Sequence, residues 1–121
     1  MPWDAPVAPT NIYGASKAWG EALGRVYSSS RDVSCICVRL GGFMQDGQTF
    51  DAEQSAGMQH AVSPRDAAQI FHKAVEAPAS LRFAIVPGIS EHRVAFQDNT
   101  RTKEALGYEP QDGTAINGPK L

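Results

Sequence analysis

Two short apolar runs set the strongest limit on how this chain can fold. Residues 33–40 and 82–87 are almost continuously apolar and rich in β-branched side chains, which is typical of strands covered on both faces, as in a parallel sheet. Each run follows a stretch with helical periodicity, so the order of elements predicts an α/β fold. Because two strands are too few for such a sheet, we expect completion by unrecognised elements, by another chain or by a portion absent from the sequence.

The first predicted helix covers about residues 12–29 and carries two distinct faces. One face is apolar and is expected to be buried, with Trp19 in the core. Its members are Ala15, Ala18, Trp19, Ala22, Leu23, Val26 and Tyr27. The opposite face carries Tyr13, Lys17, Gly20 and Gly24. Because each helical glycine costs about 1 kcal/mol relative to alanine, we expect this face to lie against a backbone or a ligand, a tolerated pair of surface glycines being the alternative.

The second predicted helix covers about residues 63–77 and has a clear start. Ser63 is the expected N-cap, Pro64 fits the first helical position, and Asp66 is placed to face the free amides of the first turn. The residues expected to be buried are Ala67, Ala68, Ile70, Phe71, Ala74 and Val75. Before this helix, residues 41–62 show no periodicity and contain neither Lys nor Arg, which predicts a long loop.

The whole chain, residues 1–121, is expected to form a single α/β domain. A short helix over about residues 99–106, capped by Asp98 or Asn99 and ended by Gly107, is its last regular element. The 11 Lys and Arg and 13 Asp and Glu give a net charge of −2 without a basic run, so we expect no nucleic-acid partner. No apolar stretch approaches the roughly 20 residues of a membrane span, and the opening residues lack the basic start of a signal peptide. We therefore expect a cytoplasmic protein with no membrane partner.

Cysteine and histidine positions argue against a metal site. Cys35 and Cys37 are the only cysteines and stand two apart, so a strand points both to one face, in a geometry poorly suited to a disulfide. His60, His72 and His92 are too dispersed to supply the remaining zinc ligands. We expect the cysteines to be small core residues and the histidines to be structural or surface residues.

A phenol and an ammonium group, at Tyr13 and Lys17, are the strongest chemical feature. Their spacing of four residues places them on one helical face, within reach of each other. An ammonium held near a phenol favours the phenolate, which can exchange a proton with a substrate hydroxyl, and the lysine could also donate hydrogen bonds to a sugar. A surface aromatic beside a solvated lysine is the alternative, because this spacing arises by chance in roughly one such chain in five.

Four segments, in the right order, resemble the extended short-chain dehydrogenases/reductases, also called the NAD-dependent epimerase/dehydratase family. They are residues 9–21, 38–42, 62–68 and, as the last, 98–101 with 106–112. The first two are similar to that family's active-site helix and following strand. The last is most like the C-terminal end of the uronate dehydrogenase branch. The resemblance covers nearly the whole chain.

The glycine-rich fingerprint that opens that family's fold, Gly-x-x-Gly-x-x-Gly after a strand, is absent from this sequence. The Ser or Thr that usually completes the family's catalytic set would lie before Met1. The resemblance therefore implies a partial Rossmann-like fold: the second half of a doubly wound parallel sheet plus substrate-side elements, lacking the N-terminal dinucleotide-binding half. Binding of the cofactor, NAD or NADP, is expected to be weak or absent without that half.

The resemblance also implies roles for individual residues. Tyr13 would be the general acid/base of hydride transfer, and Lys17 would bind the nicotinamide ribose and make the phenol more acidic. The backbone of Leu40, Gly41 and Gly42 would approach the nicotinamide end of the cofactor, where side chains would not fit.

A basic residue for the substrate is harder to find. Uronate dehydrogenases present one from the loop after the strand to hold the substrate carboxylate, whereas residues 41–62 contain none. Arg65 is the candidate substitute. The alternative is that Arg65 is a solvated surface residue without a role in substrate binding.

Two hypotheses for function follow. The first is an NAD(P)-dependent sugar or uronate oxidoreductase or epimerase of carbohydrate metabolism, with Tyr/Lys-assisted hydride transfer at a C–OH, incomplete as an isolated chain. The alternative is a non-catalytic α/β association module derived from the same fold. Its exposed strand edge would pair with a completing partner chain or, as a homodimer, with itself.

Overall fold

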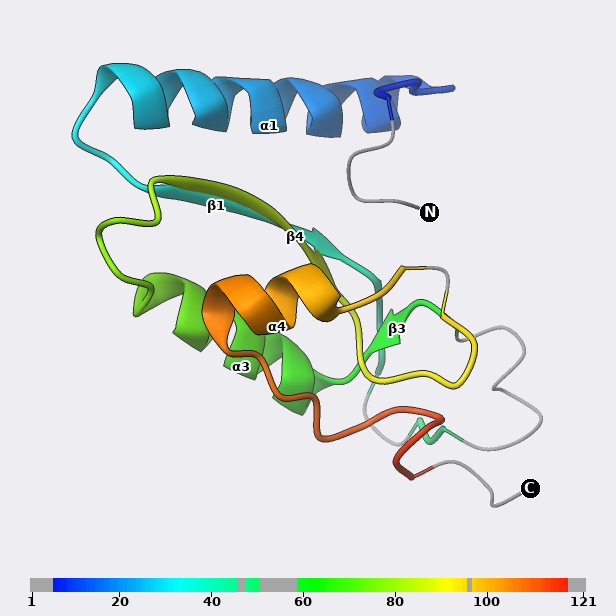
Figure 1. Ribbon diagram of the computed structural model, residues 1–121. Coiled ribbons are helices and arrows are strands. Elements are labelled where there is room, and N and C mark those ends of the chain that lie inside the picture. The colour runs from blue at the N-terminus through cyan, green and yellow to red at the C-terminus, as the bar shows by residue number, and fades with distance from the viewer. Residues whose placement is uncertain (1–5, 46–47, 51–58, 96, 118–121) are drawn as a thin grey trace.

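The computed structural model describes residues 6–45, 48–50, 59–95 and 97–117 (Figure 1). Its main elements are α1 (Ile12–Ser30), β1 (Cys35–Leu40), α3 (Pro64–Val75), β4 (Phe83–Gly88) and α4 (Thr100–Leu106). β1 and β4 pair in parallel, with Cys35 opposite Phe83 and Leu40 opposite Gly88. The alternation of helices with parallel strands is the α/β arrangement that the sequence predicts.

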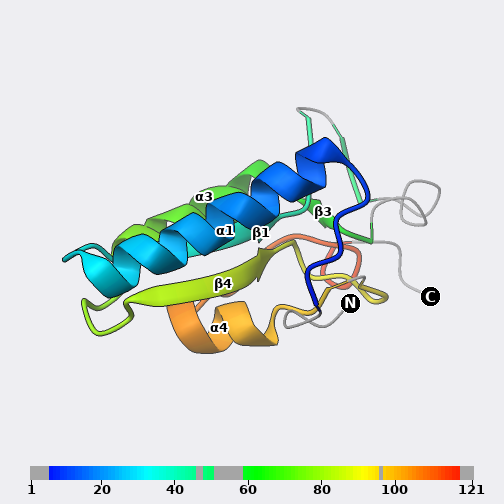
Figure 2. The same ribbon diagram turned by 90° about the horizontal axis from the view of Figure 1, so that it is seen from above.

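Helices cover both faces of this two-stranded sheet. α1 lies along one face, and α3 and α4 lie on the other (Figure 1). Seen from above, α3 lies on the side of β1 and α4 on the side of β4 (Figure 2). One cluster of buried residues lies on the α3 side: Val62, Ala67, Ile70 and Tyr108, with Val38 and Leu106 packed against them.

The predicted long loop over residues 41–62 contains two short strands, which corrects that prediction. β2 (Gly42–Phe43) and β3 (Ala61–Val62) pair in parallel, and the N–H of Gly42 donates to the carbonyl of His60 at 2.9 Å. A two-residue strand is too short to show a period of two, so the sequence carries no sign of it. Residues 46–47 and 51–58 of the predicted loop lie outside the described residues.

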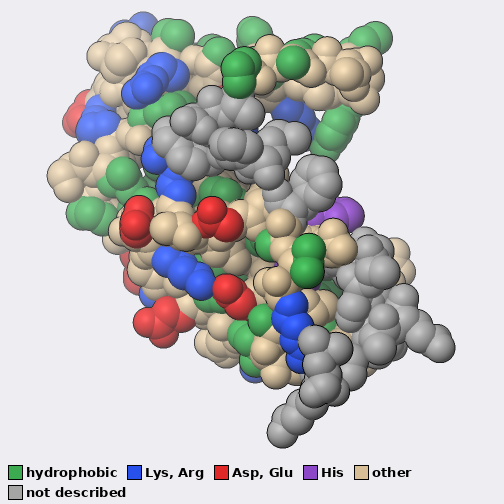
Figure 3. All heavy atoms as spheres, turned by 45° about the vertical axis from the view of Figure 1, so that its right-hand side comes forward, with side chains coloured by type: hydrophobic (Ala, Val, Ile, Leu, Met, Phe, Trp, Pro, Cys, Tyr) green, Lys and Arg blue, Asp and Glu red, His purple; other side chains and the backbone are tan. Residues whose placement is uncertain are grey.

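The apolar stripe of α1 is exposed, so the prediction that it is buried is wrong. Trp19, expected in the core, is 66% exposed, and Val26 is 56% exposed. Figure 3 shows apolar side chains along the outer side of this helix. Of the opposite face only Gly24 packs on β1, since a Cβ there would lie 3.4 Å from Sγ of Cys37, whereas a Cβ on Gly20 would meet nothing within 4 Å. The expectation that both glycines lie against a backbone or a ligand therefore holds for Gly24 and not for Gly20. Helical spacing shows which residues share a face, but it does not show whether that face is covered.

The stripe of α3 is also only partly buried. Ala67 and Ile70 are buried, whereas Phe71 is 49% exposed and Val75 is 87% exposed, contrary to prediction. Both exposed side chains belong to a face of α3 beside β1 that no described segment covers. The sequence pattern again indicates which residues of the helix share an apolar face, but it does not show that part of this face is exposed to solvent.

The helix ends follow local capping rules. Oγ of Ser63 accepts a hydrogen bond from the N–H of Asp66 at 3.1 Å, as expected of an N-cap. Asn99 occupies the N-cap position of α4 without a capping side-chain hydrogen bond, and the carboxylate of Asp98 accepts from the N–H of Thr100 at 2.7 Å instead. Gly107 ends α4 with φ of 65°, in the left-handed region that favours glycine.

The two cysteines are free and only partly buried, between β1 and α1. Burial raises the pKa of the Cys37 thiol. Among the described residues, no group of three or more His, Cys, Asp or Glu is arranged to hold a metal ion. None of the described helices combines the length and the apolar character needed to cross a membrane.

Candidate functional site

Tyr13 and Lys17 lie side by side at the start of α1, as their spacing predicts. The side chain of Asn11 accepts a hydrogen bond from the N–H of Gly14 at 2.7 Å and so fixes the first turn of the helix. Nζ of Lys17 lies 4.9 Å from the centre of the Tyr13 ring, which is a cation–π distance. Tyr13 is 71% exposed, so its hydroxyl is open to a ligand.

An ion pair one turn further along α1 holds the helix against β1. Nε and Nη2 of Arg39 donate to the two carboxylate oxygens of Glu21, at 2.7 and 3.0 Å. The hydrogen bond to Glu21 raises the pKa of Arg39. The pair joins α1 to β1 one helical turn after Lys17, while Tyr13 and Lys17 themselves stay exposed. Sequence reasoning missed it, although a single charged residue within an apolar strand is a usable signal.

Leu40 is the last residue of β1, and Gly41 and Gly42 follow it, at the same end of the sheet as the start of α1 (Figure 1). The absence of a side chain at Gly41 has a cause within the chain, because a Cβ there would collide with the carbonyl oxygen of His60. A Cβ on Gly42 would meet the His60 ring at 3.5 Å, an ordinary contact. A close-lying cofactor is therefore not needed to explain Gly41.

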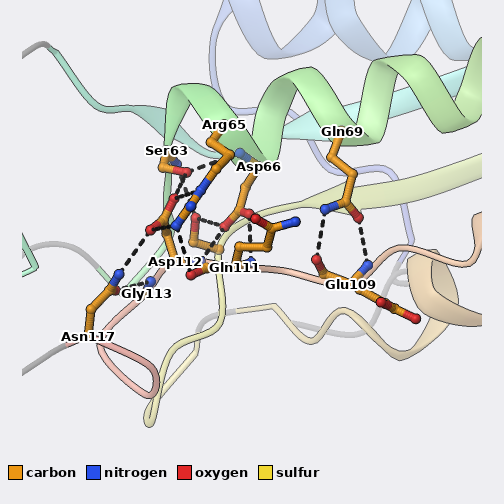
Figure 4. Close-up of polar contacts among 10 residues, drawn as sticks. Ser63, Arg65, Asp66, Gln69, Glu109, Gln111, Asp112, Gly113 and Asn117 are labelled. Atoms are coloured by element: carbon orange, nitrogen blue, oxygen red, sulfur yellow. Dashed lines mark hydrogen bonds and ion pairs between the residues drawn. The ribbon is translucent and has the colours of Figure 1, made fainter.

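Arg65 is engaged with another part of the chain. Its Nη2 and Nε donate to the carboxylate of Asp112 at 2.6 and 3.1 Å, and Nη2 also donates to the carbonyl of Gln111 (Figure 4). The hydrogen bond from Arg65 lowers the pKa of Asp112 to about 2. α3 and α1 lie on opposite faces of the sheet, so the structure does not bring Arg65 together with Tyr13 (Figure 1).

Asp66 joins the start of α3 to the C-terminal segment, a role that sequence reasoning missed. Its carboxylate is fully buried and accepts hydrogen bonds from the hydroxyl of Ser90 at 2.6 Å and from the N–H groups of Gln111 and Asp112 at 2.8 and 3.1 Å (Figure 4). The expectation that it faces the amides of its own helix is wrong, because Ser63 caps them. No local pattern could indicate partners 24 and 45 residues away.

A cavity of about 420 Å³ lies beside Arg65 and Asp112. Its walls combine apolar side chains, such as Met44 and Phe50, with polar ones, such as Ser63. The guanidinium at its edge is already matched by a carboxylate, so the described residues that line the cavity offer no unbalanced positive charge to an anionic ligand.

The described residues fit one end of a nicotinamide dinucleotide better than the other. Tyr13 and Lys17 offer a hydroxyl and an ammonium on open surface, which suit a ribose and a reacting hydroxyl. A pyrophosphate needs free amides at a helix start, usually within a glycine-rich turn. Here the starts of α1 and α3 are capped by Asn11 and Ser63.

No model of a known protein family matches the chain. Two curated proteins of Haloferax volcanii are similar to it. NAD-dependent glucose-6-phosphate dehydrogenase is 37% identical over 88% of this chain and 39% of its own length. L-arabinose 1-dehydrogenase (NAD(P)(+)) is 31% identical over 91% of this chain and 46% of its own length.

Two solved structures have the same arrangement of elements. Glucuronic acid dehydrogenase from Chromohalobacter salexigens has a TM-score of 0.75 and 29% identity, over 92% of this chain and 39% of its own. A variant of uronate dehydrogenase from Agrobacterium tumefaciens, complexed with NAD, has a TM-score of 0.77 and 25% identity, over 95% of this chain and 41% of its own. The chain thus spans about two fifths of the length of these proteins and matches their C-terminal part.

Proposed function

Because the chain is homologous, over nearly its whole length, to the C-terminal part of NAD-dependent sugar and uronate dehydrogenases, we propose that it carries the proton-transfer end of such an active site. The observation that carries the proposal is the position of the Lys17 ammonium 4.9 Å from the Tyr13 ring, on an exposed face. That face lies at the end of the sheet where ligands bind in open α/β folds.

In the proposed reaction, a C–OH group of a sugar or sugar acid is oxidised. Tyr13 Oη, as the phenolate that the positive charge of Lys17 stabilises, removes the hydroxyl proton and becomes the neutral phenol, while the hydride leaves the carbon. Lys17 would also hold the cofactor ribose through a hydrogen bond, and Leu40, Gly41 and Gly42 would hold the nicotinamide end through their backbone groups. A bound nicotinamide dinucleotide, NAD or NADP, supplies the hydride acceptor.

A substrate role for Arg65 receives less support. Its guanidinium is paired with Asp112 on the opposite face of the sheet from Tyr13, so holding a substrate carboxylate would require Asp112 to leave. We therefore do not extend the proposal to Arg65.

The substrates named for the relatives are glucose 6-phosphate, L-arabinose and uronate. All three carry an oxidisable sugar hydroxyl, and sugars and sugar acids with such a hydroxyl are the substrate class we propose.

Two measurements test this proposal. Calorimetric titration of NAD and NADH into the chain, with Lys17→Ala as control, measures whether this part of the site binds the cofactor on its own. The second replaces the matched part of the Haloferax glucose-6-phosphate dehydrogenase with this chain and follows NAD reduction with each of the three sugars.

In that hybrid, Tyr13→Phe is expected to lower turnover at least 100-fold, because it removes the general base. The matched control is Tyr27→Phe, on the exposed apolar stripe of the same helix, which should leave turnover unchanged. An active hybrid that tolerates Tyr13→Phe would overturn the proposal.

A further inference from the structure

His60 differs from the other two histidines in having no partner for its ring within the described part of the chain. Nε2 of His72 lies 3.1 Å from the carboxylate of Glu76, and both residues belong to the C-terminal end of α3. The ring of His92 is buried, and its Nε2 donates to the carbonyl of Ala61 at 2.9 Å. His60 is exposed and forms no such hydrogen bond or ion pair with a described residue. Its ring is therefore open to a ligand.

The backbone of His60 is held against the end of β1. The N–H of Gly42 donates to the carbonyl of His60 at 2.9 Å, and a Cβ on Gly41 would collide with the same carbonyl. A Cβ on Gly42 would lie 3.5 Å from Cδ2 and Nε2 of His60, so the ring lies beside Gly42. A side chain on such a fixed backbone is in position before its ligand arrives.

This position lies at the end of the sheet where the proposed reaction takes place. β3, which begins directly after His60, lies at the same end of the sheet as the start of α1, which carries Tyr13 (Figure 1). In the proposed function the backbone of Gly41 and Gly42 holds the nicotinamide end of the cofactor. The reacting sugar would then lie next to the His60 ring.

An anionic group on that sugar needs a hydrogen-bond donor, preferably one with a positive charge. Residues 41–62 contain no Lys or Arg, and His60 is their only histidine. The guanidinium of Arg65 is matched by Asp112, and the ammonium of Lys17 lies beside the Tyr13 ring. An imidazole donates from a ring N–H and becomes a cation when it is doubly protonated, so it suits phosphate and carboxylate oxygens.

We propose that His60 is a specificity-determining residue of the proposed active site and binds an anionic substituent of the sugar, a phosphate or a carboxylate. The inference rests on the proposed function for the identity of the ligand as a sugar. The contact with the anion depends on His60 alone and not on the chemistry of Tyr13. A sugar without a charged substituent gains nothing from this contact.

Nuclear magnetic resonance of the free chain tests the contact without turnover. The Cε1–H signal of His60 should shift to a plateau on titration with glucose 6-phosphate, with glucuronate or with both, and should not shift with L-arabinose. The response to each of the two anions distinguishes a phosphate site from a carboxylate site. His72 is the matched control, because its side chain is 68% exposed on α3, and its signal should stay unchanged. Equal shifts of the two signals, or no shift of His60 with either anion, would overturn the proposal.

Kinetics of the hybrid dehydrogenase provide the second readout. His60→Ala should raise KM for the anionic sugar by about tenfold, because a hydrogen bond to a charged group is lost. The value of kcat should stay nearly unchanged, because the substituent is held equally in the ground state and the transition state. KM for L-arabinose should not change, and His72→Ala should leave all three KM values as they are. An equal rise of KM for charged and neutral sugars would show a merely structural role for His60 and overturn the proposal.

The two proposals fail separately. A hybrid that needs Tyr13, and in which His60→Ala changes no KM, supports the proposed function and overturns the anion contact. A His60 signal that shifts with the anions, in a chain whose hybrid tolerates Tyr13→Phe, supports the contact and overturns the proposed function. If the hybrid has no turnover, the magnetic resonance titration alone decides on the contact.

Discussion

The carboxylate of Glu21 and the guanidinium of Arg39 face each other in a two-pronged ion pair that joins α1 to β1. The two side chains are only 18% and 28% exposed. Glu21→Gln removes the charge while keeping the shape, and a charge-assisted hydrogen bond in such a setting contributes more than a neutral one. We expect the free energy of unfolding to fall by about 1–2 kcal/mol, measured by urea denaturation.

The matched control is Glu104→Gln, because Glu104 is an exposed residue of α4. Its effect should stay within about 0.5 kcal/mol. Equal losses in the two variants would contradict a special role for the pair.

Asp66→Asn is expected to loosen the C-terminal segment from the start of α3. The two oxygens of Asp66 accept hydrogen bonds from one hydroxyl and two backbone N–H groups, so an amide NH₂ in either orientation meets a donor. We expect a loss of about 1–3 kcal/mol in the free energy of unfolding. Amide exchange at Gln111 and Asp112 should become faster.

Asp32→Asn is the control for that substitution. The carboxylate of Asp32 pairs with Arg82 at 3.0 Å, but its side chain is fully exposed. Exposed pairs contribute little, so the change in stability should be near zero. If Asp66→Asn behaves like Asp32→Asn, the buried network does not hold the segment.

The Arg65–Asp112 pair predicts an acid dependence of stability. Arg65 holds the pKa of Asp112 at about 2 in the folded chain, below the usual 3.8. Because the folded value is the lower one, the stabilisation is complete above about pH 4 and is lost as the pH falls through about 2. Wild type should exceed Asp112→Asn in stability by about 1 kcal/mol at neutral pH, allowing for the exposed guanidinium.

Urea denaturation of both proteins from pH 7 to pH 2 tests this. Other carboxylates titrate in both proteins, so the difference between the two curves is the informative quantity. That difference should shrink towards pH 2. A difference that stays constant over the range would mean that the ionisation of Asp112 does not contribute.

The order of the main elements could be predicted because each carries a local signal. Apolar runs identified β1 and β4, and Ser63 with Pro64 marked the start of α3. Strands of two residues, such as β2 and β3, are too short to show the alternation of apolar and polar residues that indicates a strand. The exposure of Trp19 and Val75 could not be predicted either, because a pattern defines a face while burial depends on what lies against it.

In the candidate site too, contacts between residues close in the sequence could be predicted and contacts between distant residues could not. Tyr13 and Lys17 are four residues apart, and helical geometry alone brings them together. The partner of Arg39 is 18 residues away and those of Asp66 are up to 46 residues away, so their contacts depend on the tertiary fold. A single sequence carries little information about such pairs.

Gly41 and Gly20 should respond in opposite directions to the same substitution. A Cβ on Gly41 would collide with the carbonyl oxygen of His60 and lie 2.8 Å from Cγ2 of Ile89, so Gly41→Ala must force neighbouring segments apart. We expect a loss of about 1–3 kcal/mol in the free energy of unfolding. A Cβ on Gly20 meets nothing within 4 Å, so Gly20→Ala should gain about 0.5–1 kcal/mol from helix propensity. Urea denaturation measures both changes, and a stable Gly41→Ala variant would contradict the close approach of His60 to the end of β1.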